Sequence, residues 1–325
     1  MGWLTRALGA VDRTQQRHPW LAFPYAVAKK FGDDGAGDLA ALVAYYGFFS
    51  LFPLLLVFAS VLGLVLRGHA DLQDSLLDSA LARFPLIGVQ LRKDVSALGA
   101  AAGVPLGIGI ATTLWAGLGV VKSMQKALDT VWDIPYKDRP NFLATTVRSL
   151  LMLVVLGIVT VASALAAGVG AGSSSWWWGL LGVIVSLALN LLLFLLAFRI
   201  LTAASVSWAD IRPGAIVGAI GWTALQAFGG YFVGHQLQGA SEVYGTFAVV
   251  IGLLAWIYLG AQLTLYSAEV NVVRVTRLWP RSITGEPLTE ADQRGLRRLA
   301  KVEERIPEEQ VDVTIDRSEG DRRAG

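Results

Sequence analysis

Five long stretches of this sequence carry no Asp, Glu, Lys or Arg, and they limit the possible folds more than any other feature. They cover residues 39–66, 95–121, 149–198, 213–241 and 243–268. A helix of about 20 apolar residues is long enough to cross the hydrocarbon core of a bilayer. The third stretch is too long for one crossing, and small residues at 168–175 interrupt it. The five stretches therefore predict six crossings.

The predicted fold class is all-α, a polytopic transmembrane bundle of six helices. The expected spans are 39–66, 98–121, 149–168, 176–198, 213–234 and 245–268. A soluble protein with buried helices is the alternative, but soluble core helices rarely repeat this length without a charge. Only 16% of the residues are charged, whereas about 25% is usual for a soluble domain. Composition thus favours the membrane protein.

The distribution of Lys and Arg predicts that both termini are cytoplasmic. Short loops rich in Lys and Arg stay on the cytoplasmic side. With both termini inside, the cytoplasmic segments hold 23 of the 27 basic residues and the outer segments hold 4. We expect a cytoplasmic amphipathic arm over residues 1–38 without a cleaved signal peptide, and an outer helical loop over residues 67–97.

The segment after the last span, residues 269–325, has a different composition, with 11 basic and 12 acidic residues. Thr289 followed three positions later by Asp292 is typical of a helix N-terminus, so we predict a helix that runs to about residue 305. Beyond about residue 307 we predict disorder in this charged cytoplasmic tail. We expect no ligand-binding domain there, only a tail able to contact anionic lipid.

Charged residues elsewhere are expected to be solvated. Most of those between residues 122 and 148, which include Asp129 and Asp133, should face water or lipid headgroups. Glu269, at the inner end of the last span, is expected to be hydrated. Because no charged side chain lies within a predicted span, a proton relay through the membrane centre is disfavoured. Sodium binding by the carbonyls of broken helices stays open.

Uncharged polar residues mark a candidate cavity or solute path in the spans. The candidate residues are Tyr45, Tyr46, Ser50, Pro53, Tyr258 and Gln262. Pro53 has no N–H to donate to the Phe49 carbonyl, so a polar notch is expected beside Ser50. The alternative for each residue is a hydrogen bond between helices. Small residues at spacing four, such as Gly214 and Gly218, predict close approach of neighbouring helices.

No motif indicates an enzyme. The three histidines, His18, His69 and His235, stand far apart, the chain has no cysteine, and it lacks phosphate-binding and nucleophile-elbow motifs. We therefore expect no catalytic residue, metal or cofactor. The net charge of +2 does not indicate a nucleic-acid partner.

Three segments together resemble one known family. They are residues 39–58, 114–143 and 243–273, and they resemble the YihY/virulence factor BrkB family, formerly labelled ribonuclease BN-like. The matching positions are Tyr45, Tyr46, Ser50, Phe52 and Pro53, then Arg139 and Pro140, then Tyr244, Gly245, Trp256, Tyr258, Glu269 and Asn271. Ser267 departs from the glycine expected before the Ala-Glu pair.

The resemblance implies a six-span protein of the bacterial inner membrane. Ribonuclease activity is disfavoured because the sequence lacks a clustered set of metal ligands for an aqueous site. Our leading hypothesis is that the protein transports or handles a lipid-like or small amphipathic solute. The competing hypothesis is a scaffold in envelope assembly that transports nothing. Expected partners are membrane lipids, an unidentified solute, and envelope proteins or further copies of the chain.

Overall fold

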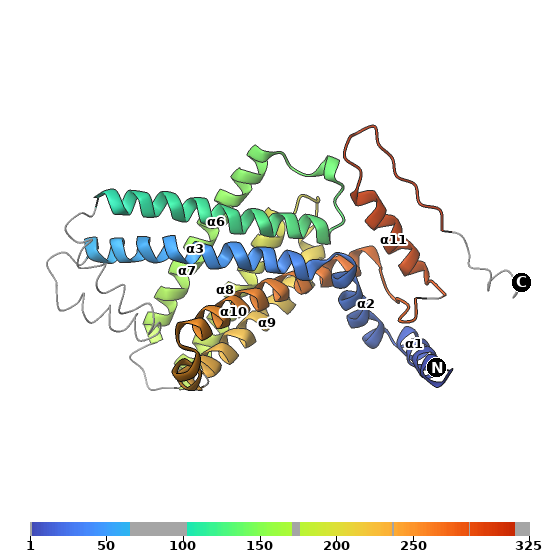
Figure 1. Cartoon of the computed structure of the whole chain (residues 1–325), viewed down its shortest axis with the longest axis horizontal. Helices are drawn as coiled ribbons and strands as arrows, with labels where there is room; N and C mark the ends of the chain where they lie inside the picture. Colours follow the sequence, from blue (N-terminus) through green and yellow to red (C-terminus); the bar gives the residue numbers. More distant parts are fainter. Residues whose placement is uncertain (1, 66–102, 171–175, 236, 286, 316–325) are drawn as a thin grey trace, which may run out of the picture. The chain divides into compact units, whose positions relative to one another are not determined.

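The computed structural model describes residues 2–65, 103–170, 176–235, 237–285 and 287–315 (Figure 1). Within these residues the chain is helical and contains no strand, which confirms the all-α class. The elements are α1 Gly2–Arg17, α2 Pro19–Asp33, α3 Ala36–Val65, α6 Gly103–Val131, η1 Tyr136–Asp138, α7 Phe142–Gly170, α8 Trp176–Leu201, α9 Trp208–His235, α10 Leu237–Thr276 and α11 Glu290–Val302. The predicted outer loop at 67–97 lies outside the described residues.

Each predicted span lies on one of the six long helices, α3 and α6 to α10, where it is described. Three segments of the described chain are long and apolar enough to cross a membrane, namely Phe142–Val159, Leu180–Leu201 and Val250–Thr276. In the first two, only 11% and 6% of the segment is buried inside the protein although the mean hydropathy is 2.2 and 2.7. Apolar surface of that extent requires an apolar surrounding. The count of six spans, the cytoplasmic termini and the domain boundaries stay predictions.

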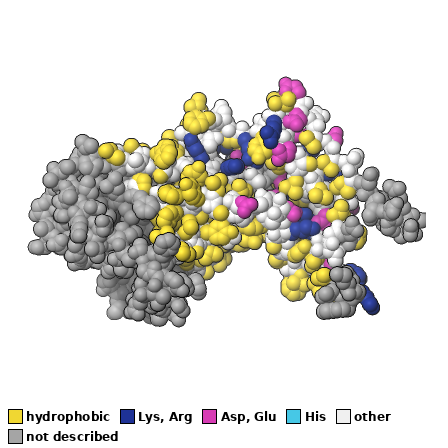
Figure 2. Space-filling view, viewed as in Figure 1, with side chains coloured by type: hydrophobic (Ala, Val, Ile, Leu, Met, Phe, Trp, Pro, Cys, Tyr) yellow, Lys and Arg dark blue, Asp and Glu magenta, His cyan; other side chains and the backbone are white. Residues whose placement is uncertain are grey.

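The helices divide into two compact units. The first holds Met1–Ala40, Met124–Ala224 and Gly260–Gly325, and the second holds Ala41–Ser123 and Leu225–Leu259. In the first unit α7 packs against α8, and α1 against α2. Figure 2 shows hydrophobic side chains over the long helices and a group of charged side chains near α2 and α11.

The core of the first unit joins α2 to the carboxyl-terminal part of α10. Ala26 and Val27 of α2 are buried against Val273 and Leu278. Phe31 stacks on Tyr266 with the ring centroids 3.8 Å apart. The segment 19–33 is therefore a packed helix.

A capping box begins α11, as the spacing of Thr289 and Asp292 predicts. The Thr289 hydroxyl accepts from the Asp292 N–H, and the Asp292 carboxylate accepts from the Thr289 N–H. The helix ends at Val302, three residues before the predicted end. Asp292 also accepts from Lys29 and from Arg281, so the first turn of α11 is tied to α2 and to the chain after α10.

Candidate functional site

Two of the predicted cavity residues of α3, Tyr45 and Tyr46, lie on an exposed aromatic face in the second unit. Tyr45 lies 5.6 Å from the Tyr46 ring and 4.8 Å from the Phe49 ring, measured between centroids. The three side chains are 55%, 40% and 51% exposed, respectively. We call Tyr45, Tyr46 and Phe49 the α3 aromatic face. Tyrosine combines an apolar ring with a polar tip, which suits contact with amphipathic molecules.

Ser50 and Pro53 follow this face on the same helix. The Ser50 hydroxyl donates to the Gly47 carbonyl at 2.7 Å. Pro53 lies inside α3 and supplies no N–H to the Phe49 carbonyl. The helix thus has a local gap in its hydrogen-bond ladder beside a hydroxyl, and the polar notch expected there stays a prediction.

Neighbouring helices of the second unit approach α3 at two glycines. A Cβ at Gly119 of α6 would lie 2.9 Å from the Tyr46 ring, and one at Gly47 of α3 would lie 2.9 Å from the Ile257 side chain of α10. Figure 1 shows α3 and α6 running alongside each other. The half-buried Tyr258 follows Ile257 on α10. Five of the six predicted cavity residues therefore belong to the second unit, whereas Gln262 belongs to the first.

The other residues singled out by the motifs have different surroundings. Arg139 donates to the Ile134 carbonyl at 3.2 Å and lies over the Tyr136 ring at 4.2 Å, so it stabilises the turn before Pro140. Phe52, Tyr244 and Gly245 occupy helical positions in α3 and α10, and Trp256 is half-buried in α10.

Asn271 fixes a close contact between α9 and α10 in the first unit. Its side-chain carbonyl accepts from the Gly214 N–H at 2.6 Å. A Cβ at Gly214 would lie 2.0 Å from the Ser267 carbonyl, and one at Gly218 would lie 2.7 Å from the Phe194 ring. The predicted close approach at the α9 glycines is therefore confirmed. Ser267 itself is buried and donates to the Leu263 carbonyl.

A group of charged side chains is buried in the first unit, which the sequence did not predict. Lys30 of α2 is 1% exposed and donates to Asp133 at 2.9 Å, to the Val131 carbonyl at 3.2 Å and to Asp34. The other Asp133 oxygen accepts from Arg298 of α11 at 2.7 Å. The four buried residues Lys30, Asp34, Asp133 and Glu269, with the partly exposed Arg298, are called the buried ion cluster below. It joins α2, α10, α11 and the end of α6.

Glu269 is the least compensated member of the buried ion cluster. Its side chain is 0% exposed, and its carboxylate lies near Lys30, Asp34 and Asp133. The Asp34 carboxyl lies within hydrogen-bonding reach of Glu269, but no N–H or hydroxyl donor of the described protein reaches either Glu269 oxygen. The cluster contains three carboxyl groups and two cations, so one retained proton would balance its charge. Such an arrangement can bind and release a proton.

The backbone at Asp133 is held in an unusual conformation. Asp133 follows α6 with φ of 54°, in the left-handed region, where Asp is tolerated better than most residues. The Ile134 N–H donates to the Asp129 carbonyl at 2.9 Å, and the Asp133 N–H donates to the Thr130 carbonyl at 2.9 Å. These are the two bonds of a Schellman motif. The helix end thereby points the Asp133 carboxylate at Lys30.

The expected solvation of three acidic residues is wrong. Asp129 and Asp133 are 4% and 7% exposed, and Glu269 is fully buried. Asp129 accepts from the Ala203 N–H at 2.9 Å, which anchors the chain after α8. Partners distant in the sequence remove these carboxylates from water, so the local composition gave no signal. A signal that the sequence analysis missed is the spacing of Lys30 and Asp34, which places both on one side of a helix end.

Burial also changes proton affinities around this site. The pKa of Lys30 is raised, since burial acts to lower it but the carboxylates of Glu269, Asp133 and Asp34 outweigh that effect. Burial raises the pKa of Asp34 from 3.8 to about 6, although the Lys30 ammonium acts in the opposite direction. Burial likewise raises the pKa of Asp129 from 3.8 to about 6, against the Ala203 N–H that lowers it.

We expect Asp129→Asn to flatten the pH dependence of stability. A carboxyl with a raised pKa contributes stability that is present below pH 3.8 and lost as the pH rises through about 6. Asn keeps an acceptor for the Ala203 N–H but does not titrate. Thermal unfolding of the detergent-solubilised protein across this pH range measures the effect. Asp138→Asn, which replaces an exposed carboxylate, is the control. Equal slopes for Asp129→Asn and the unaltered protein would contradict the prediction.

Comparison of the sequence with models of known protein families identifies a family for this chain. A family model for virulence factor BrkB matches residues 27–287. The chain belongs to the virulence factor BrkB family. The matched region of this BrkB family member contains the α3 aromatic face and every member of the buried ion cluster except Arg298. It ends before α11.

Two of three relatives are named as membrane proteins, and the third is named as ribonuclease-like. The chain is 26% identical to inner membrane protein YhjD of Escherichia coli K12, over 82% of this chain and 85% of that protein. It is 25% identical to a UPF0761 membrane protein of Stenotrophomonas maltophilia R551-3, over 80% of this chain and 62% of that protein. It is 23% identical to the putative ribonuclease-like protein YfkH of Bacillus subtilis 168, over 72% of this chain and 88% of that protein. No solved structure matches this chain.

These findings make the chain a membrane protein of the BrkB family, with an all-helical fold. In the part of the chain that the structure describes, no group of three or more His, Cys, Asp or Glu side chains is placed to hold a metal ion.

Proposed function

We propose that this protein transports or handles a lipid-like or small amphipathic solute, with the α3 aromatic face as part of the path. The observation that carries this proposal is the combination of exposed aromatic rings with a broken hydrogen-bond ladder on one helix. Tyr45, Tyr46 and Phe49 supply apolar rings, and the two tyrosines also supply hydroxyl tips. Beside them lie the Ser50 hydroxyl and the Phe49 carbonyl, which Pro53 leaves without its helical donor.

The chemistry of this face suits a molecule with both an apolar part and a polar head. Aromatic rings contact acyl or aliphatic groups, while hydroxyl tips and a free carbonyl can bind hydrogen-bonding headgroups. In this proposal Tyr258 of α10 extends the path, and the six-span topology with cytoplasmic termini delivers the solute across the inner membrane. Direct flux measurements test the proposed solute class.

We expect Tyr45→Ala combined with Tyr46→Ala to reduce solute flux about tenfold, because both rings and both hydroxyls leave the path. The measurement is the flux of fluorescently labelled phospholipid and of small osmolytes in proteoliposomes, compared with empty liposomes. Tyr45→Phe is the finer variant, since it keeps the ring beside Phe49 and removes only the hydroxyl. Trp177→Ala is the matched control, because it removes an exposed ring from α8 in the first unit.

Two outcomes would contradict the proposal. One is flux no higher than that of empty liposomes for both solute classes. The other is equal flux in the double Tyr variant and the unaltered protein. The scaffold hypothesis predicts the first of these. Deletion of residues 285–325 is a poor way to separate the two hypotheses, because it also removes Asp292 and Arg298, which bond to Lys29 and Asp133.

A further inference from the structure

The exposed side of α11 carries a row of basic residues. Arg294, Arg297, Arg298 and Lys301 follow the spacing of one helical face. Ala291, Asp292, Gly295 and Val302 of the same helix are buried. The helix is thus fixed on its buried side and presents cations on the other.

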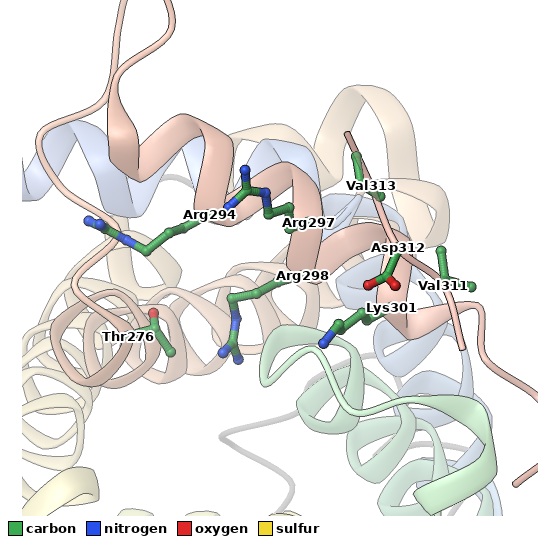
Figure 3. Close-up of a pocket in the computed structure, with 8 residues that line it drawn as sticks. All are labelled: Thr276, Arg294, Arg297, Arg298, Lys301, Val311, Asp312 and Val313. Atoms are coloured by element: carbon green, nitrogen blue, oxygen red, sulfur yellow. The ribbon is translucent and has the colours of Figure 1, made fainter. Parts of the chain in front are cut away.

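These four cations line a pocket in the first unit. The pocket has a volume of about 480 Å³ and is lined by Thr276, Arg294, Arg297, Arg298, Lys301, Val311, Asp312 and Val313 (Figure 3). Arg298 and Lys301 extend from α11 to the same side in Figure 3, and Asp312 comes from the chain that passes beside the helix. The lining contains four cations and a single carboxylate, so it has a formal charge of +3.

Within the described residues, two of the cations have no hydrogen-bond partner for their charged groups. The Arg298 guanidinium is held by Asp133 and the Trp132 carbonyl, and the Arg294 guanidinium donates to the Arg277 carbonyl. By contrast, no described oxygen accepts a hydrogen bond from the guanidinium of Arg297 or the ammonium of Lys301. The Arg298 side chain is therefore held in place at the edge of the pocket, while the side chains of Arg297 and Lys301 are able to reorient towards a ligand. Arginine and lysine bind phosphate oxygens through charge-assisted hydrogen bonds.

The pocket lies where a membrane-spanning segment ends. Thr276 is the last residue of the apolar segment Val250–Thr276 and lines the pocket. The apolar side chains of Val311 and Val313 offer contact to an uncharged part of the ligand. A cationic pocket at such a position is within reach of a lipid headgroup. Residues 269–325 therefore contain a formed pocket, whereas the sequence predicted only a tail able to contact lipid.

We propose that the α11 pocket binds a phosphate group, carried either by an anionic phospholipid of the adjacent leaflet or by a free anion. Arg297 and Lys301 bind the phosphate oxygens, and Arg298 completes the positive wall. This site is separate from the solute path proposed for α3, and it does not depend on that path. Seven of its eight lining residues, all except Thr276, also lie outside the region that the BrkB family model matches.

The test measures ligand-induced stabilisation of the full chain through its tryptophan fluorescence during heating. One arm adds inorganic phosphate to the detergent-solubilised protein. The other compares nanodiscs of phosphatidylcholine with nanodiscs that also contain phosphatidic acid. A ligand that binds only the folded protein raises the unfolding temperature, and the rise grows with the logarithm of one plus the ratio of the free ligand concentration to Kd. The test variant is Arg297→Gln with Lys301→Gln, and the matched control is Lys126→Gln with Arg212→Gln, two exposed cations that do not line the pocket.

We expect the test variant to need about tenfold more ligand for the same stabilisation, while the control variant responds like the unaltered protein. Stabilisation by phosphatidic acid alone assigns the site to a lipid headgroup, and equal stabilisation by inorganic phosphate assigns it to a free anion. Either result supports the proposal if the stabilisation is weaker in the variant Arg297→Gln with Lys301→Gln. Stabilisation that this variant leaves unchanged, or no stabilisation in either arm, overturns it. Equal unfolding temperatures without ligand establish that the variant folds.

Discussion

Replacement of Lys30 by methionine is expected to lower the free energy of unfolding by about 3 to 5 kcal/mol, the range for breaking a buried ion pair on one side. Lys30 lies beside three buried carboxyl groups, those of Asp34, Asp133 and Glu269. Methionine fills a similar volume but leaves those groups without the ammonium. Thermal and chemical unfolding in detergent, followed by tryptophan fluorescence, measures the loss.

The neighbouring lysine provides a matched control for this prediction. Lys29 is 23% exposed in its side chain, and its partner Asp292 also accepts from Arg281 and from the Ser282 N–H. Lys29→Met should therefore cost much less than Lys30→Met. A similar loss for both variants would show that the buried ion cluster has no special role in stability.

A double variant separates the ion pair from packing. Asp133→Asn removes one carboxylate and keeps a residue suited to the left-handed conformation at φ of 54°. If Lys30 and Asp133 interact strongly, Lys30→Met with Asp133→Asn will lose less stability than the sum of the two single losses. If the stability losses of the two single variants add up in the double variant, the loss in Lys30→Met comes from packing and not from the interaction with Asp133.

The helical framework could be predicted because its signals are local. Charge-free stretches located the long helices, small residues at 168–175 marked the break between α7 and α8, and Thr289 with Asp292 marked the start of α11. Each signal depends on residues within a few turns of one another. The glycines of α9 were also predictable, since their spacing on one helix indicates a contact face.

The buried ion cluster could not be predicted in this way. Lys30 and Asp133 are 103 residues apart in the sequence, and Asp133 and Arg298 are 165 apart. Their sequence surroundings are polar, so local composition indicates solvent-exposed charges. Only the packing of α2 and α11 beside α10 and the end of α6 removes them from water. Glu269 gave a partial signal, because it follows directly on a long apolar span, but sequence alone could not distinguish hydration from burial.

The approach of α9 to α10 makes Gly214 the position with the least tolerance for a side chain. We expect Gly214→Ala to lower the free energy of unfolding by about 3 kcal/mol or more, from overpacking and loss of a buried hydrogen bond together. The added Cβ would lie 2.0 Å from the Ser267 carbonyl, which is backbone of α10 and cannot turn aside. The helices must separate, and the Gly214 N–H then loses its 2.6 Å bond to Asn271.

Other helical glycines give a graded comparison for this substitution. At Gly218 the added Cβ would meet the Phe194 ring at 2.7 Å, a side chain that can move, so Gly218→Ala should cost less than Gly214→Ala. At Gly157 of α7 nothing lies within 4 Å, so Gly157→Ala should leave the unfolding temperature unchanged or slightly higher. The expected order of destabilisation is therefore Gly214, Gly218, Gly157. Should Gly214→Ala prove as stable as Gly157→Ala, α9 and α10 would have to lie farther apart than this structure has them, and Asn271 would need another partner.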